Sequence, residues 1–129
     1  MSNDIKQIIV IRKDLNLKKA KLAAYVAHIS MKFLLDNNEA NRGDEFTIKL
    51  SPEEAVWLRE GSTPIVFGIN SEDALRDMMF KAELDGIETY PLFVQDQNEF
   101  SGDNTLVCAA FGPASSQDLS GIMNKLKTI

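Results

Sequence analysis

Residues 7–11 read QIIVI and are followed at once by residues 12–21, RKDLNLKKAK. The first stretch is a continuous apolar run rich in β-branched residues, the pattern of a strand that is covered on both faces. The second stretch contains five of the fourteen Lys and Arg residues of the chain. A buried strand that ends in a basic segment indicates an α/β fold with a charged region at the end of its first strand.

The pattern changes from strand to helix after Lys19. Apolar residues then recur every three or four positions, which predicts an α-helix to about Asp36. Residues 37–44, NNEANRGD, are polar and predict a surface loop, whereas residues 46–50, FTIKL, alternate like a short edge strand. The stripe that defines the helix consists of Leu22, Val26, Ile29 and Phe33.

The next helix is marked by its capping residues. Residues 51–61, SPEEAVWLREG, begin with Ser51 as N-cap, and Glu54 three positions later completes a capping box. Gly61 is the expected stop. A second buried strand over residues 63–69 and a helix over residues 70–86 follow.

Two strands are predicted close together near the end of the chain, over residues 87–94 and 105–111. Pro91 has no N–H for a ladder, which indicates an edge strand or a bulge. About ten residues separate the strands, too few for a helical crossover, so they are either antiparallel neighbours or joined by a functional loop. A helix follows, with Leu119, Ile122, Met123 and Leu126 on its packed face.

The predicted order of elements is β-α-α-β-α-β-β-α. We expect one α/β domain over residues 1–129, with a four-stranded mixed β-sheet covered by helices on both faces.

Composition excludes several classes of protein. No stretch has the roughly 18 apolar residues of a membrane span, and the N-terminus lacks the features of a secretory signal, so we expect a cytoplasmic protein. One cysteine and one histidine are too few soft ligands for a zinc site, and we expect no metal and no cofactor. The GxGxxG, P-loop and nucleophile-elbow motifs are absent.

The charge of the chain is unevenly distributed. Residues 12–21 have a net charge of +4, so the other 119 residues sum to −9 within a total of −5. An acidic protein does not coat nucleic acids nonspecifically, because that mode of binding requires a large positive surface. A small basic site is compatible with these numbers, and so is a solvated loop and helix start.

Candidate site residues follow from the rule that ligands bind beyond the carboxyl ends of strands in open α/β sheets. If the first and third predicted strands are parallel, the lysines near the first helix start and the carboxylate of Asp96 lie over one edge. That helix has a polar stripe containing Lys21 and His28, and its free N–H groups favour a phosphate. The alternatives are a histidine bonded to the backbone at a boundary and an aspartate that only forms a turn.

Four segments together resemble the archaeal and eukaryotic type of peptidyl-tRNA hydrolase. They are residues 8–32, 57–75, 81–96 and 107–115, in register over nearly the whole chain. Markers of that family are V-x-R-x-D-L before a Gly-Lys-Gly-Lys turn, A-A-Q-x-x-H-A on a helix, D-A-G-x-T after the third strand, and T-x-L-x-I-G-P-A near the end. The resemblance implies a metal-independent hydrolase, commonly a homodimer, that cleaves the ester between a peptide and the 3′ ribose of tRNA.

The resemblance assigns roles to single residues. Lys21 and Asp96 match the functional lysine and aspartate, and Asn98 lies where the family has a functional threonine. These three are the expected catalytic residues. Contacts with tRNA phosphates are expected from Arg12, Lys13, Lys18, Lys19 and His28.

The chain departs from the family at several positions. Both turn glycines are replaced, Tyr25 stands for the helix glutamine, and Val107 aligns with a second threonine. The leading hypothesis is a peptidyl-tRNA hydrolase, or a relative acting on an aminoacyl ester, with weakened activity. The alternative is an inactive descendant that binds tRNA ends, nucleotides or a protein partner.

Overall fold

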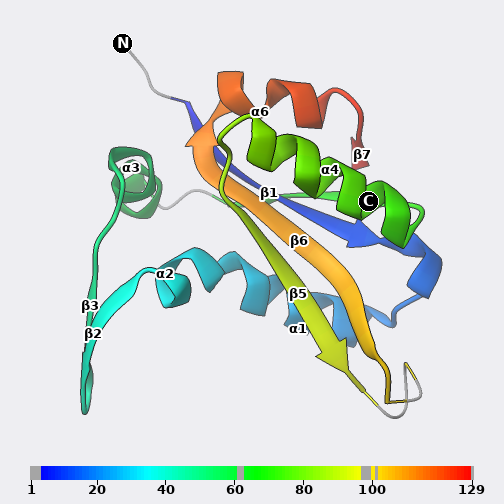
Figure 1. The fold of residues 1–129 in the computed structure, drawn as a ribbon, viewed down its shortest axis with the longest axis horizontal. Helices are drawn as coiled ribbons and strands as arrows, with labels where there is room; N and C mark the ends of the chain where they lie inside the picture. The colour runs from blue at the N-terminus through cyan, green and yellow to red at the C-terminus, as the bar shows by residue number, and fades with distance from the viewer. Residues whose placement is uncertain (1–3, 61–62, 97–99, 101, 129) are drawn as a thin grey trace.

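The computed structural model describes residues 4–60, 63–96, 100 and 102–128, and only the backbone of residues 38–42. Its main sheet has five strands in the order β5-β6-β1-β4-β7 (Figure 1). In this sheet β1 and β4 pair in parallel, whereas β1–β6, β5–β6 and β4–β7 are antiparallel. The strands are β1 (Ile5–Arg12), β4 (Ile65–Ile69), β5 (Thr89–Gln95), β6 (Asn104–Ser115) and β7 (Lys127–Thr128).

The predicted mixed sheet is confirmed, but the predicted number of four strands is wrong. The chain folds back after the last helix, and Lys127 and Thr128 pair with β4. Two residues are too short to produce an alternating pattern, which is why the sequence does not reveal this strand.

Helices cover both faces of the sheet, as predicted. One layer contains α1 (Lys19–Ser30), α2 (Lys32–Asp36) and α3 (Pro52–Glu60). The other contains α4 (Glu72–Leu84) and α6 (Ser116–Met123). The central strand β1 supplies both cores, because its successive side chains point to opposite faces. Ile9 and Ile11 pack in the first layer, whereas Ile8 and Val10 pack in the second.

The region after α1 differs from prediction in two ways. The expected helix to Asp36 is interrupted at Met31, and the side chain of Gln7 donates to the Ser30 carbonyl at 3.0 Å where the helix breaks. The expected loop over residues 37–44 is wrong. It contains β2 (Asn38–Arg42), which forms a separate hairpin with β3 (Glu45–Ile48). The predicted FTIKL strand therefore exists, but outside the main sheet.

The capping box of α3 is confirmed. Ser51 Oγ accepts from the Glu54 N–H at 3.1 Å, and Glu54 Oε1 accepts from the Ser51 N–H at 2.8 Å. The helix ends at Glu60, and the proposed stop at Gly61 lies outside the described residues.

The last two long strands confirm the interpretation of Pro91. β5 is an edge strand, and its register with β6 shifts between Leu92 and Phe93. The two strands are antiparallel neighbours. β6 is longer than predicted, because residues 112–115, which resemble a turn in the sequence, continue the strand.

Candidate active site

Topology brings the ends of three strands to one edge. β4 is parallel to β1, and β5 has the same direction as β1 because both are antiparallel to β6. The basic segment follows β1, and Asp96 follows β5 directly. The segment continues as a short 3-10 helix, η1 (Lys13–Leu15), and then as α1.

Lys21 and Asp96 meet at this edge. The Lys21 ammonium donates to Asp96 Oδ2 at 2.9 Å, across 75 positions of sequence. Figure 1 shows the start of α1 beside the end of β5. The Asp96 side chain is 16% exposed and that of Lys21 is 44% exposed. The predicted proximity of these two residues is confirmed, and the lysine is accessible to a ligand.

The N-terminus of α1 is electrostatically unusual. Lys18 is the N-cap, in extended conformation and without a side-chain cap, and the first turn has no acidic residue. The first helical hydrogen bond runs from the Leu22 N–H to the Lys18 carbonyl at 2.9 Å. The N–H groups of Lys19 and Ala20 precede that bond, in the helix position at which backbone N–H groups bind anions. Exposed Lys18 and Lys19 add positive charge where the helix dipole disfavours it.

Arg12 is buried rather than open to solvent. Its side chain is 10% exposed and forms a two-point contact with Asp14, at 2.6 and 3.1 Å. It also donates to the Leu106 carbonyl at 3.0 Å and contacts Glu72 of α4 at 3.4 Å. The hydrogen bond to Arg12 is the main reason why the pKa of Asp14 lies below its ordinary value. Glu72 is not recognisable from the sequence as a residue of this region, although it begins the helix that follows β4.

Lys13 extends over the sheet. It is exposed, and a Cβ built on Gly68 of β4 would overlap its side-chain carbons. Glycine at position 68 therefore makes room for the Lys13 stem.

The other candidate residues have different surroundings. His28 is exposed on α1, and its ring has no hydrogen bond or ion pair within the described part of the chain. The interpretation of His28 as a residue bonded to the backbone is thus not supported. The Tyr25 hydroxyl is buried without a hydrogen-bond partner among those residues. Val107 is fully buried, and Asn98 lies outside the described residues.

The described residues include no group of three His, Cys, Asp or Glu side chains that could hold a metal ion. Cys108 is buried in β6, and burial raises the pKa of its thiol to about 12. Within the described ranges, no helix is long and apolar enough to span a bilayer.

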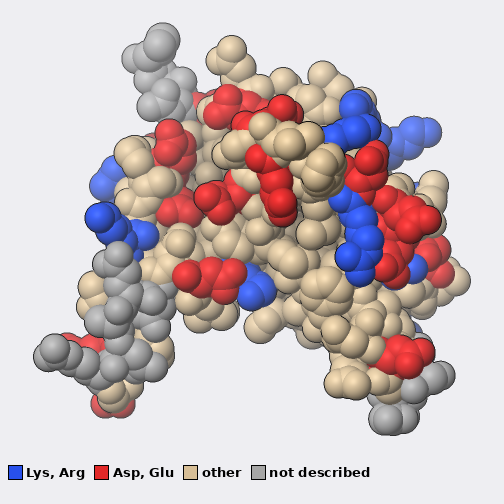
Figure 2. Space-filling model, viewed as in Figure 1, with Lys and Arg blue, Asp and Glu red and all other residues tan. Residues whose placement is uncertain are grey.

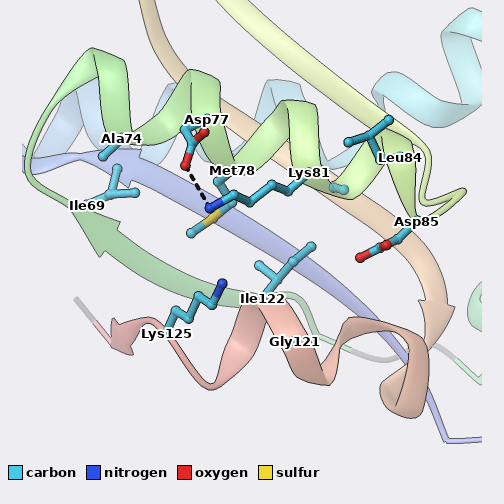
Figure 3. Close-up of a pocket in the computed structure, with 11 residues that line it drawn as sticks. Ile69, Ala74, Asp77, Met78, Lys81, Leu84, Asp85, Gly121, Ile122 and Lys125 are labelled. Carbon is cyan, nitrogen blue, oxygen red and sulfur yellow. Dashed lines mark ion pairs between the residues drawn. The ribbon is translucent and has the colours of Figure 1, made fainter.

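A cavity of about 380 Å³ lies in the opposite helical layer, between α4 and α6 (Figure 3). Ile69, Met78 and Ile122 line its apolar part, and the Lys81–Asp77 ion pair, at 3.0 Å, lies at its side. None of the sequence-predicted site residues lines it.

Comparison with a solved structure supports the fold alone. A protein of unknown function from Agrobacterium tumefaciens strain C58 superposes with a TM-score of 0.61 at 15% identity, covering 100% of this chain and 99% of its own.

Sequence comparison identifies the family. The model for peptidyl-tRNA hydrolase PTH2 matches residues 5–129. A peptidyl-tRNA hydrolase from Haloquadratum walsbyi is 33% identical over 123 residues, which are 95% of this chain and 97% of the relative. One from Methanocaldococcus jannaschii is 30% identical over 128 residues, 97% of this chain and 100% of the relative. Because the match spans nearly the whole chain and includes the strand ends that form the Lys21–Asp96 site, the chain belongs to the PTH2 family of peptidyl-tRNA hydrolases.

Proposed function

We propose that this peptidyl-tRNA hydrolase cleaves its ester with Lys21 and Asp96 as catalytic residues. The observation that carries the proposal is their 2.9 Å contact at the common edge of β1, β4 and β5. A carboxylate beside an accessible ammonium is a suitable arrangement for ester hydrolysis, which needs an oriented water and positive charge near the developing oxyanion.

In this mechanism, a water oxygen attacks the carbonyl carbon of the ester between the peptide and the tRNA 3′ ribose. Asp96 orients that water and holds the lysine, while the Lys21 ammonium stabilises the negative charge on the carbonyl oxygen. The attacking water gives up one proton, the bond from the carbonyl carbon to the ribose oxygen breaks, and that proton passes to the ribose oxygen. Asn98 supplies an amide hydrogen bond in place of the hydroxyl of a threonine.

The phosphates of the tRNA end are assigned to the basic segment and α1. Lys13, Lys18 and Lys19 are exposed, and the N–H groups of Lys19 and Ala20 at the α1 start add donors for a phosphate oxygen. His28 lies two turns further along the same helix and extends this surface. The expected phosphate contact of Arg12 does not belong to this set, because its guanidinium is buried and already hydrogen-bonded.

Two further properties belong to the proposal. The substrate is a product of translation, so we expect the protein to act in the cytoplasm. We also expect a homodimer, which sedimentation equilibrium would test by the mass of the particle in solution.

Hydrolysis of N-acetylated aminoacyl-tRNA tests the catalytic assignment. Lys21→Ala and Asp96→Asn should each lower kcat by about 10²- to 10³-fold, the usual cost of removing one group that stabilises the transition state. Lys49→Ala is the matched control, because Lys49 is exposed and remote in sequence from the basic segment. Wild-type activity in Lys21→Ala would refute the catalytic role of Lys21.

A second outcome concerns the inactive alternative. The relatives named above are peptidyl-tRNA hydrolases, which gives that alternative no support. Binding of tRNA without turnover by the wild-type protein would nevertheless refute the proposed activity and favour a binding module.

A further inference from the structure

Arg12 connects three other segments at the end of β1, the strand that leads to Lys21. It is the last residue of β1, and it contacts Asp14 in η1, Leu106 in β6 and Glu72 at the start of α4. Because the side chain is only 10% exposed, these contacts are partly or fully shielded from water, where hydrogen bonds to charged groups are strongest.

The contact between Arg12 and the Leu106 carbonyl lies where β1 and β6 stop pairing. The paired register of β1 and β6 ends at Ile11 and Cys108. Beyond that pair, β1 turns into η1, while β6 continues to pair with β5. Leu106 lies beyond that last pair. The Arg12 guanidinium therefore replaces the backbone ladder at the point where the two strands separate.

The two strands lead to the two halves of the site. β1 leads through η1 to α1 and Lys21, and the Asp14 carboxylate ties η1 to the guanidinium. Asp96 directly follows the last residue of β5, Gln95. The next strand, β6, begins at Asn104, which is two residues before Leu106. A guanidinium can hold a carboxylate and a carbonyl at once, because its donors form a rigid planar fork.

We propose that Arg12 is a positioning residue: with Asp14, it sets the separation between the α1 start bearing Lys21 and the β5–β6 loop bearing Asp96. This inference rests on the proposed catalytic role of that pair. It differs from a direct contact with tRNA phosphate, which would require an accessible guanidinium, and from a purely structural role, which would affect folding but not catalysis.

Steady-state kinetics of Arg12→Gln, at a temperature where circular dichroism shows the variant folded, separates these roles. Positioning predicts that kcat falls by about 10- to 100-fold with KM nearly unchanged, because small misplacements of catalytic groups have effects of that size. Arg12→Lys should restore little of kcat, since an ammonium cannot reproduce the fork. Arg59→Gln is the control, since Arg59 is exposed on α3 and the substitution makes the same change in charge.

Other results would overturn the proposal. A rise in KM with unchanged kcat, reversed by Arg12→Lys, would indicate a phosphate contact. A lower Tm with wild-type kcat and KM would indicate a structural role alone.

If the wild-type protein does not hydrolyse the substrate, the proposed function fails and kinetics cannot test the role of Arg12. A crystal structure of Arg12→Gln then tests that role directly. Separation of the Lys21 ammonium from the Asp96 carboxylate, relative to 2.9 Å, supports positioning. An unchanged distance in the variant overturns it.

Discussion

At the residue scale, burial divides the basic segment into two groups. Arg12 lies inside, with its charge matched by Asp14 and Glu72, whereas Lys13, Lys18 and Lys19 are exposed. Arginine suits the first environment, because its planar fork satisfies several acceptors at once and its charge is less strongly hydrated than that of lysine. The sequence shows five neighbouring cations, but only their surroundings distinguish an internal contact from a ligand contact.

The ion pair of Asp14 predicts a pH dependence of stability. The pKa of Asp14 in the folded protein is lowered from its ordinary 3.8, so its contribution is present above that pH and is lost as pH falls through the lower folded value. Asp14→Asn should reduce the free energy of unfolding by about 1 kcal/mol at neutral pH, after allowance for partial exposure. Urea unfolding measured from neutral pH to below 3.8 should show the two proteins converging; a constant difference would contradict the assignment.

Cys108 predicts a test of the core. The side chain is fully buried in β6, and desolvation raises the pKa of its thiol from 9.0 to about 12. That change alone lowers the thiolate fraction near neutral pH by about a thousandfold, and the thiolate is the reactive form. A thiol reagent should therefore label the native protein only as fast as it unfolds, and label it at once in denaturant. Rapid labelling of the native protein would show that β6 is accessible.

At the scale of elements, the residues at the N-terminus of α1 would destabilise this helix in isolation. Lys18 as N-cap offers no acceptor to the first N–H groups, and Lys19 and Lys21 repel the positive end of the helix dipole. By contrast, α4 and α6 begin with Ser71 and Ser115, each of which accepts from a helical N–H at 3.1 Å. The absence of a side-chain cap at the N-terminus of α1 agrees with the proposal that an anion binds there.

The missing cap of α1 predicts that a substitution which stabilises the helix will weaken tRNA binding. Lys18→Asp should raise the free energy of unfolding by about 1 kcal/mol, because an aspartate caps the helix and complements its dipole. The same substitution should weaken tRNA binding, since it puts a negative charge where a phosphate is proposed. Chemical denaturation and filter binding measure the two effects, with Lys49→Asp as the control for net charge. A destabilised variant, or one with unchanged affinity, would contradict this account.

Elements defined by strong local signals were predicted well, and those stabilised by tertiary contacts were not. The capping box of α3 and the buried β1 strand are local, and both are confirmed. The break at Met31 involves Gln7, which is 23 positions from Ser30, and the pairing of β7 requires the presence of β4. Neither partner is visible in the neighbouring sequence.

At the scale of the whole molecule, the proposed RNA site is a small basic region on an acidic protein. The chain has a net charge of −5, and Figure 2 shows acidic side chains spread over the face that it presents. Long-range attraction to RNA is therefore weak, and binding depends on the few cations near the α1 start.

A limited salt dependence of tRNA binding follows from this distribution. Three lysines that each neutralise one phosphate predict a slope of log affinity against log salt of about −2 to −3, since each contact contributes about −0.7 to −0.9. Each of Lys13→Gln, Lys18→Gln and Lys19→Gln should reduce that slope by about one unit or less. Binding that does not change with salt would refute the phosphate contacts, and a much steeper slope would require a larger basic surface.

Local patterns in the sequence determined the alternation of strands and helices, the burial of β1 on both faces, the α3 cap and the candidates Lys21 and Asp96, because periodicity and residue chemistry act over a few positions. The tertiary structure alone decided that Lys21 and Asp96 are in contact, that Arg12 faces inward, and that the sheet has a fifth strand. Each of these depends on how strands far apart in the chain pair, and that pairing arises only when the sheet assembles around its core.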